Sequence, residues 1–124
     1  MVMIWKQLNA MTESEAYDAI VALLVEELGC SPGKLSMDTD LFGDLGVDGA
    51  DAEELFEQIE KRYEVNFDGI DWDRHFGPEG SFNPISWIMP SYYRWHRNRV
   101  PVRVRHLMDA VRMKNWSMEY PAAS

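Results

Sequence analysis

The stretch DTDLFGDLGVDGADAEELFEQIEKRYEVNF, from Asp38 to Phe67, decides the fold. Within it, apolar residues recur every three or four positions from about Asp48 to Tyr63, which predicts a helix with one buried face. The buried stripe comprises Leu55, Phe56, Ile59 and Tyr63, and the other faces carry Asp51, Glu53, Glu54, Glu57 and Glu60. The residues before Asp48 are rich in Gly and Asp, as is typical of a loop. We therefore expect an acidic loop followed by an acidic amphipathic helix.

Two further helices are predicted, one on each side of this stretch. The earlier helix begins with a capping-box pattern, in which Thr12 caps the helix and Glu15 reaches back, and it ends at Gly29. Its apolar stripe comprises Tyr17, Ile20, Val21, Leu24 and Leu28. The later helix is expected to start at Pro101, a residue that suits a first helical turn. Its apolar stripe comprises Val104, Leu107, Met108 and Val111.

The start of the later helix has a competing interpretation. Val100, Val102 and Val104 alternate with polar residues, which is also the period of a strand. The helical spacing continues to Val111 after that alternation ends, and this favours a helix. A short helical turn is also expected around Trp72 to Phe76. The predicted fold class is therefore all-α.

The Asp38–Phe67 stretch resembles the centre of an acyl carrier protein. That family shows an acidic loop with Leu and Phe, then the motif D-L-G-x-D-S-L-D, then an acidic second helix. The matching residues here are Asp38, Leu41, Phe42, Asp44-Leu45-Gly46, Asp48-Gly49-Ala50-Asp51, Glu54-Leu55 and Ile59-Glu60. The chain is also similar to a family of short bacterial acyl-carrier-like proteins of unknown function. The resemblance implies a single acyl-carrier-protein-like helical bundle over residues 1–124, with an aromatic-rich insertion at about 66–100 before the last helix.

The resemblance fails at the residue that defines carrier activity. Carrier proteins attach phosphopantetheine to the Ser of that motif, and this chain has Gly49 there, which offers no hydroxyl nucleophile. No serine occurs between Ser36 and Ser81, so a shifted register does not restore one. We therefore expect no phosphopantetheine and no other cofactor. Glycine is also tolerated where a chain enters a helix, which gives Gly49 a purely structural explanation as well.

The acidic second helix is the surface that carrier proteins present to basic patches on their partner enzymes. By that resemblance, the candidate partner-binding residues are Asp44, Asp48, Asp51, Glu54, Glu57 and Glu60. A run of charge by itself is more typical of a solvated helix face. The resemblance adds the expectation of a basic protein partner, such as an acyl-processing enzyme. A genuine carrier role in fatty-acid or polyketide-like synthesis is the alternative, and Gly49 argues against it.

Charge is divided unevenly along the 124 residues, whose net charge is −9. Residues 1–80 contain 19 acidic and 5 basic side chains, whereas residues 81–124 contain 2 acidic and 7 basic ones. An acidic half repels nucleic acid and anionic membranes and attracts basic proteins. The tract from Ser91 to His106 interleaves arginines with aromatics, a combination that binds single-stranded nucleic acid. A nucleic-acid or regulatory adaptor is thus a further alternative, but the net charge favours aromatics in a secondary core and arginines paired with the acidic half.

Other kinds of site find little support in the sequence. Cys30 is the single cysteine, so neither an internal disulfide nor a CxxC metal clip can form. Calcium-loop frames that start at Asp38 or Asp44 place Gly49 or Leu55 where a bidentate Glu is required. The three histidines are scattered and are expected at the surface or in loops: His75, His96 and His106. We expect no metal site and no enzyme. The apolar stretches are too short to span a bilayer and no signal-peptide layout is present, which predicts a cytoplasmic domain.

Overall fold

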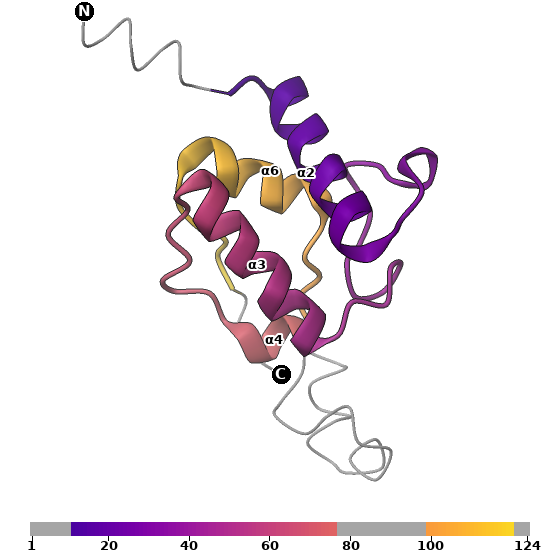
Figure 1. Cartoon of the computed structure of the whole chain (residues 1–124). Coiled ribbons are helices and arrows are strands. Elements are labelled where there is room, and N and C mark those ends of the chain that lie inside the picture. Colours follow the sequence, from indigo (N-terminus) through magenta and orange to yellow (C-terminus); the bar gives the residue numbers. More distant parts are fainter. Residues whose placement is uncertain (1–10, 77–98, 121–124) are drawn as a thin grey trace, which may run out of the picture.

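The computed structural model describes residues 11–76 and 99–120, and within these ranges it contains four α-helices and no multi-residue strand (Figure 1). In chain order the elements are α2 (Glu13–Leu28), a short 3₁₀ helix η1 (Pro32–Lys34), α3 (Gly49–Tyr63), α4 (Trp72–Phe76) and α6 (Val104–Met113). The predicted all-α class is confirmed for these residues. None of the helices that the structure describes is long and apolar enough to cross a membrane.

Local capping signals fix both ends of α2, as the sequence predicted. The Thr12 hydroxyl accepts a hydrogen bond from the Glu15 backbone N–H, and the Glu15 carboxylate accepts one from the Thr12 N–H, each at 3.1 Å. At the other end, Gly29 adopts a left-handed conformation with φ 71°, which glycine reaches without steric cost. These contacts satisfy backbone groups that a helix end otherwise leaves unpaired.

The second helix, α3, also has the predicted bounds. Asp48 is its N-cap, because its carboxylate accepts a hydrogen bond of 2.8 Å from the Asp51 N–H. The helix ends at Tyr63, and Glu64 follows in a left-handed conformation with φ 55°. The buried face consists of Ala52, Leu55, Phe56 and Ile59, which matches most of the predicted apolar stripe.

The last helix begins later than predicted. We expected α6 to start at Pro101, but its first residue is Val104. The chain is instead extended up to Arg103, and residues 102–104 pair in an antiparallel manner with residues 39–41: the Leu41 N–H donates to the Val102 carbonyl (2.9 Å) and the Val104 N–H donates to the Thr39 carbonyl (3.0 Å). The strand-like alternation therefore corresponds to the extended residues before Val104, and the helical spacing corresponds to α6 from Val104 onward.

One hydrophobic core joins α2, α3 and α6. Its helical members are Ala16, Ile20, Leu23 and Leu24 of α2, the buried face of α3, and Val104, Leu107, Met108, Ala110 and Val111 of α6. Helices α2 and α6 pack directly against each other (Figure 1). The predicted core residues Tyr17, Val21 and Leu28 lie at the edge of this core and are half-buried. The apolar spacing in the sequence thus identified the helix faces that meet.

Aromatic side chains extend the core next to α3. The Phe56 ring lies 4.9 Å from Phe67, 5.3 Å from Trp72, 6.0 Å from Phe76 and 6.1 Å from Trp116, measured between ring centroids. Residues 66–76, the first part of the expected insertion, are therefore attached to α3 by packing. Residues 77–98 lie outside the described residues, and with them the first half of the aromatic and basic tract from Ser91 to His106.

Candidate functional site

The exposed face of α3 carries a stripe of four glutamates. Glu53, Glu57, Glu60 and Glu64 follow one another at intervals of four, three and four residues, which places them along one side of the helix and its cap. All four side chains are exposed. Glu57 forms an ion pair with Lys61 at 2.9 Å, and because both groups are exposed this pair contributes little to stability. We call these four residues the α3 acidic stripe.

The six residues predicted to bind a partner fall into two groups in the structure. Asp44 and Asp48 serve the backbone: the Asp44 carboxylate accepts a hydrogen bond from the Asp40 N–H (2.8 Å), and Asp48 caps α3. The other four are exposed along the helix: Asp51, Glu54, Glu57 and Glu60. The structure thus brings these four acidic side chains onto the surface of one element.

Sequence reasoning left two members of the stripe out of the candidate site. Glu53 precedes Glu57 by four residues, so the helical spacing alone would have placed them together. Glu64 lies one residue beyond the predicted helix and joins the stripe because it forms the cap. A search for acidic residues at intervals of three and four would have found both.

The basic residue Arg62 of α3 points away from this stripe. Its guanidinium makes two hydrogen bonds to the Glu26 carboxylate of α2, at 3.0 and 3.1 Å. The hydrogen bonds and the charge of Arg62 lower the pKa of Glu26 from its ordinary value. Arg62 therefore joins α3 to α2 and leaves the charge of the stripe in place.

Gly49, the position of the missing serine, is the first residue of α3 and follows the Asp48 cap directly. It is not among the described glycines with positive φ, which are Gly29, Gly46 and Gly69. Its backbone therefore does not require glycine, because other residues adopt the same helical conformation without strain. The expected position of Gly49 at the helix entry is confirmed.

The acidic loop is joined by ion pairs to the basic segment before α6 and to the first turn of α6: one pair is buried and the other is exposed. The Arg99 guanidinium lies 2.9 Å from the Asp40 carboxylate, where both side chains are largely buried, and it also stacks on the Phe42 ring at 5.2 Å. Arg105 pairs with Asp38. The expectation that arginines of the tract pair with the acidic half is confirmed for Arg99 and Arg105. Arg99 is largely buried in its ion pair, whereas Arg105 stays partly exposed, and the arginines of the tract before Arg99 lie outside the described residues.

Asp40 remains charged in this environment. Burial works to raise the pKa of its carboxyl, but hydrogen bonds from Arg99 and from the Gly43 and Phe42 backbone, together with the Arg99 charge, outweigh it and lower the pKa. Gly43 lies close to this pair: a Cβ on Gly43 would be 2.7 Å from Asp40 Oδ2 and 3.4 Å from Arg99 Nη2. The absence of a side chain at Gly43 therefore makes room for the ion pair.

The sequence prediction for His75 is wrong, because this residue is neither at the surface nor in a loop. His75 is 1% exposed within α4. Its Nδ1 lies 2.7 Å from the Val100 carbonyl oxygen, and its Nε2 lies 2.7 Å from the Tyr120 hydroxyl. Burial lowers the pKa of the imidazole. The signal in the sequence was the spacing of Trp72, His75 and Phe76, which places His75 on the apolar side of one helical turn.

The Tyr120 hydroxyl has two further partners. The Trp116 indole Nε1–H donates to it at 2.9 Å and the Asp71 backbone N–H donates at 3.0 Å. Together with His75 and Val100 they form a cluster that we call the His75–Tyr120 node. The node therefore connects α4 with the segment before α6, which contains Val100, and with the segment after α6, which contains Trp116 and Tyr120.

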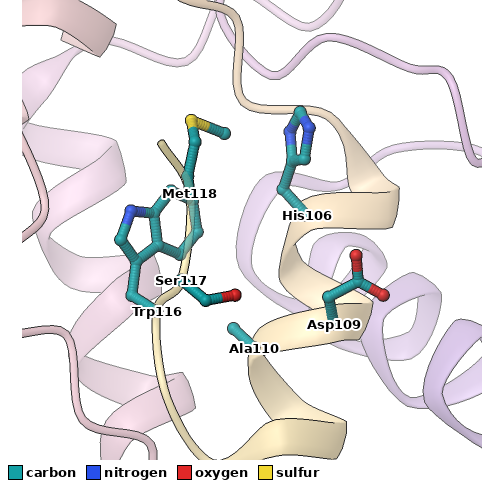
Figure 2. Close-up of a pocket in the computed structure, with 6 residues that line it drawn as sticks. All are labelled: His106, Asp109, Ala110, Trp116, Ser117 and Met118. Atoms are coloured by element: carbon teal, nitrogen blue, oxygen red, sulfur yellow. The ribbon is translucent and has the colours of Figure 1, made fainter. Parts of the chain in front are cut away.

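A pocket of about 250 Å³ lies between α6 and the segment that follows it (Figure 2). It is lined by His106, Asp109 and Ala110 from α6 and by Trp116, Ser117 and Met118 from the following segment. His106 Nδ1 accepts a hydrogen bond of 2.9 Å from the Arg103 N–H, so the proton of the neutral ring resides on Nε2. The predicted surface position of His106 is only partly correct, since the ring is half-buried and caps the helix.

A wider and more open groove of about 680 Å³ lies at the start of α2. It is lined by Glu13, Ser14, Tyr17, Ser36, Met37, Asp38 and Met108. Its Asp38 carboxylate already pairs with Arg105, which leaves few polar groups to converge on a ligand. Within the two described ranges, no group of three or more His, Cys, Asp or Glu residues is arranged to hold a metal ion.

Comparison with known proteins gives a family and no structural relative. No solved structure matches the chain. The sequence model of one protein family, described as a protein of unknown function (DUF1493), matches residues 4–118. This match spans most of the 124 residues. The chain is therefore a member of the DUF1493 family of proteins of unknown function.

Proposed function

We propose that this protein is an acyl-carrier-like module that carries no prosthetic group and binds a basic protein partner through the exposed acidic face of α3. The observation that carries the proposal is the net negative charge of the α3 acidic stripe. Three cations pair with carboxylates outside the stripe: Arg62 with Glu26, Arg99 with Asp40, and Arg105 with Asp38. Lys61 pairs with Glu57 at 2.9 Å, and the charge of Glu60 also acts on it.

The place of Gly49 supports the likeness to carrier proteins. In that family the attachment Ser begins the second helix, and Gly49 is the first residue of α3 directly after its Asp48 cap. Without a hydroxyl at this position there is no oxygen to attack coenzyme A, so the chain is not phosphopantetheinylated. The proposed function therefore retains the recognition surface of a carrier and lacks its chemistry.

Electrostatics determines how such a contact behaves. Complementary charge mainly accelerates association and selects the partner, whereas a buried apolar contact would mainly slow dissociation. Exposed charges are screened over about 8 Å at physiological ionic strength. Binding through the stripe is therefore expected to weaken as salt is added.

The test compares three forms of the full chain as bait in a cell extract. The first is the wild type, and the second is Glu53→Lys/Glu60→Lys, which reverses two charges of the stripe. The matched control is Asp18→Lys/Asp73→Lys, which makes the same change in net charge at exposed residues of α2 and α4. We expect one basic protein to be retained by the wild type and the control and lost from the stripe variant. Equal retention by all three forms would contradict the proposal.

A further inference from the structure

The hydrogen atoms of the His75–Tyr120 node can be assigned from its geometry. A carbonyl oxygen only accepts, so His75 Nδ1 carries a proton and donates it to Val100. The neutral ring then has an unprotonated Nε2, which accepts the proton of the Tyr120 hydroxyl. The hydroxyl oxygen uses its acceptor capacity for the Trp116 and Asp71 N–H groups. Every polar group of the node is satisfied when His75 is neutral.

A proton on His75 Nε2 breaks this pairing of hydrogen-bond donors with acceptors. The Tyr120 oxygen would then face three donors, from His75, Trp116 and Asp71, while its own hydroxyl proton would lose its acceptor. A buried polar group without a partner is costly, and a buried charge more so. The node therefore cannot keep its present arrangement once His75 is charged.

The charged and titratable groups around His75 come from each element packed against it. Asp71, just before α4, favours the charged imidazole, whereas Arg74 of α4 and His106 of α6 disfavour it. Tyr120, from the segment after α6, is the direct partner and is itself half-buried. Burial is the largest influence and opposes protonation, so the neutral form and the intact node persist at neutral pH.

We propose that the His75–Tyr120 node is an acid-sensitive latch, which holds residues 117–120 against α4 at neutral pH and releases them when His75 takes up a proton. Trp116 stays behind, because its backbone N–H donates to the Asn66 carbonyl at 2.8 Å and its ring is buried against Phe56 and Phe67. Ser117 and Met118 form one wall of the pocket in Figure 2, and release therefore opens that pocket.

The Trp116 indole N–H is a direct reporter of the latch, because its acceptor is the Tyr120 oxygen. We would record the indole resonances of the ¹⁵N-labelled full chain from about pH 7.5 to about pH 5, the range in which histidines titrate. The resonance that is missing from Trp116→Phe identifies the residue. Its protection from hydrogen exchange, corrected for the intrinsic pH dependence, is expected to fall about tenfold for each pH unit between about pH 6.5, where a solvated histidine titrates, and the transition. The Trp116 backbone N–H is expected to keep its protection.

Two variants test whether the pH-dependent change at the Trp116 indole is caused by the protonation of His75 or by another group. Tyr120→Phe lacks the acceptor, so its Trp116 indole N–H should be unprotected from hydrogen exchange already at neutral pH, and this protection should not change as the pH falls. His106→Gln removes the other described histidine near Trp116 while keeping an acceptor for the Arg103 N–H, as glutamine does in a capping box. The transition should persist in this variant. A pH-dependent loss of Trp116 indole protection that persists in Tyr120→Phe, or that disappears in His106→Gln, would overturn the proposal.

A measurement on the wild type alone covers the case in which a variant does not fold. The ¹⁵N shifts of the His75 ring should show the Nδ1–H tautomer at neutral pH, and its protonation should coincide with the movement of the Trp116 indole resonance. An Nε2–H tautomer, or two transitions at different pH, would rule out the latch.

Discussion

At the scale of single residues, Asp40 shows how the unequal charge of the two halves is resolved inside the molecule. Asp40 is only 7% exposed, and its carboxylate pairs with Arg99, which comes from the basic part of the chain. A buried ion pair is not by itself strong evidence of stability, but removal of one partner leaves an uncompensated charge and costs about 3–5 kcal/mol. The stability of the protein is therefore expected to be sensitive to substitutions that displace the Asp40 or the Arg99 side chain.

Gly43→Ala is expected to destabilise the protein by about 1–3 kcal/mol, the usual cost of overpacking. The added methyl group would lie 2.7 Å from an Asp40 oxygen that the Arg99 pair holds in place. Urea unfolding followed by circular dichroism measures the change. Gly33→Ala is the matched control, because a Cβ there meets no atom within 4 Å. Equal stability of the two variants would show that the Asp40 side chain moves aside freely.

Gly49 leads to a prediction about covalent chemistry. After incubation with a phosphopantetheinyl transferase and coenzyme A, the wild-type chain is expected to keep its mass, because Gly49 has no nucleophilic oxygen. Gly49→Ser restores the hydroxyl at a backbone position that accepts any residue, and it is expected to gain the mass of the prosthetic arm. Intact-protein mass spectrometry distinguishes the two. A mass gain on the wild type would contradict the account of a module without a prosthetic group.

At the scale of elements, the helices differ in how far the sequence could predict them. The bounds of α2 and α3 were predicted within one residue, since they depend on local signals such as the Thr12 capping box and the Asp48 cap. The start of α6 was predicted three residues too early, because residues 102–104 pair with residues 39–41. The alternation of Val100, Val102 and Val104 was a local signal for the extended entry to α6, but the segment with which it pairs lies far away in the sequence and could not be identified from that alternation.

The capping box of α2 predicts a measurable loss when its hydroxyl is removed. Thr12→Ala should lower the free energy of unfolding by about 1 kcal/mol, the usual cost of losing an N-cap side chain. Thr12→Ser keeps the hydroxyl and should stay close to the wild type. Denaturant unfolding of the three proteins provides the comparison. A Thr12→Ser variant as unstable as Thr12→Ala would mean that the threonine methyl group matters more than the cap.

Substitutions in the contact between α2 and α6 are expected to reduce stability more than the loss of the Thr12 cap does. Leu107 is 0% exposed on the face of α6 that belongs to the core. Leu107→Ala should destabilise the protein by about 2–5 kcal/mol, because the lost methyl groups leave a cavity. Met113→Ala, at a residue of the same helix that is 58% exposed, should change stability by less than about 1 kcal/mol. If Leu107→Ala and Met113→Ala destabilised the protein equally, the core would have to contact a different face of α6.

At the scale of the whole molecule, titratable groups buried by the fold make stability depend on pH. The pKa of Asp40 is lowered, so its contribution is fully present above its ordinary value of 3.8 and is lost as the pH falls through the lowered value. The pKa values of His75 and His106 are also lowered, chiefly by burial. The unfolded chain therefore takes up these protons first as the pH falls below 6.5, and stability decreases.

The urea midpoint is accordingly expected to fall in two stages as the pH is lowered, first below about 6.5 and again below about 4. His106→Gln should reduce the first stage without removing it, because His75 still titrates. A midpoint that stays constant from pH 7 to about pH 5 would contradict the buried, neutral state of His75.

The distribution of charge was only partly readable from the sequence. The counts showed an acidic and a basic half, but not that Arg99 and Arg105 would fold back onto Asp40 and Asp38. The same counts could not show that Asp44 and Asp48 support the backbone while Glu53 extends the exposed stripe. These outcomes depend on which segments meet in space, and that information is spread over the whole chain.

The central claim is that the acidic face of α3 recognises a basic protein. The most direct test is titration of the protein retained by the wild-type bait against the wild type, Glu53→Lys/Glu60→Lys and Asp18→Lys/Asp73→Lys, each at low and at physiological salt. We predict that the stripe variant binds at least about tenfold more weakly, that the control stays within about threefold of the wild type, and that added salt reduces the difference. Equal affinity of the stripe variant and the control would contradict the claim.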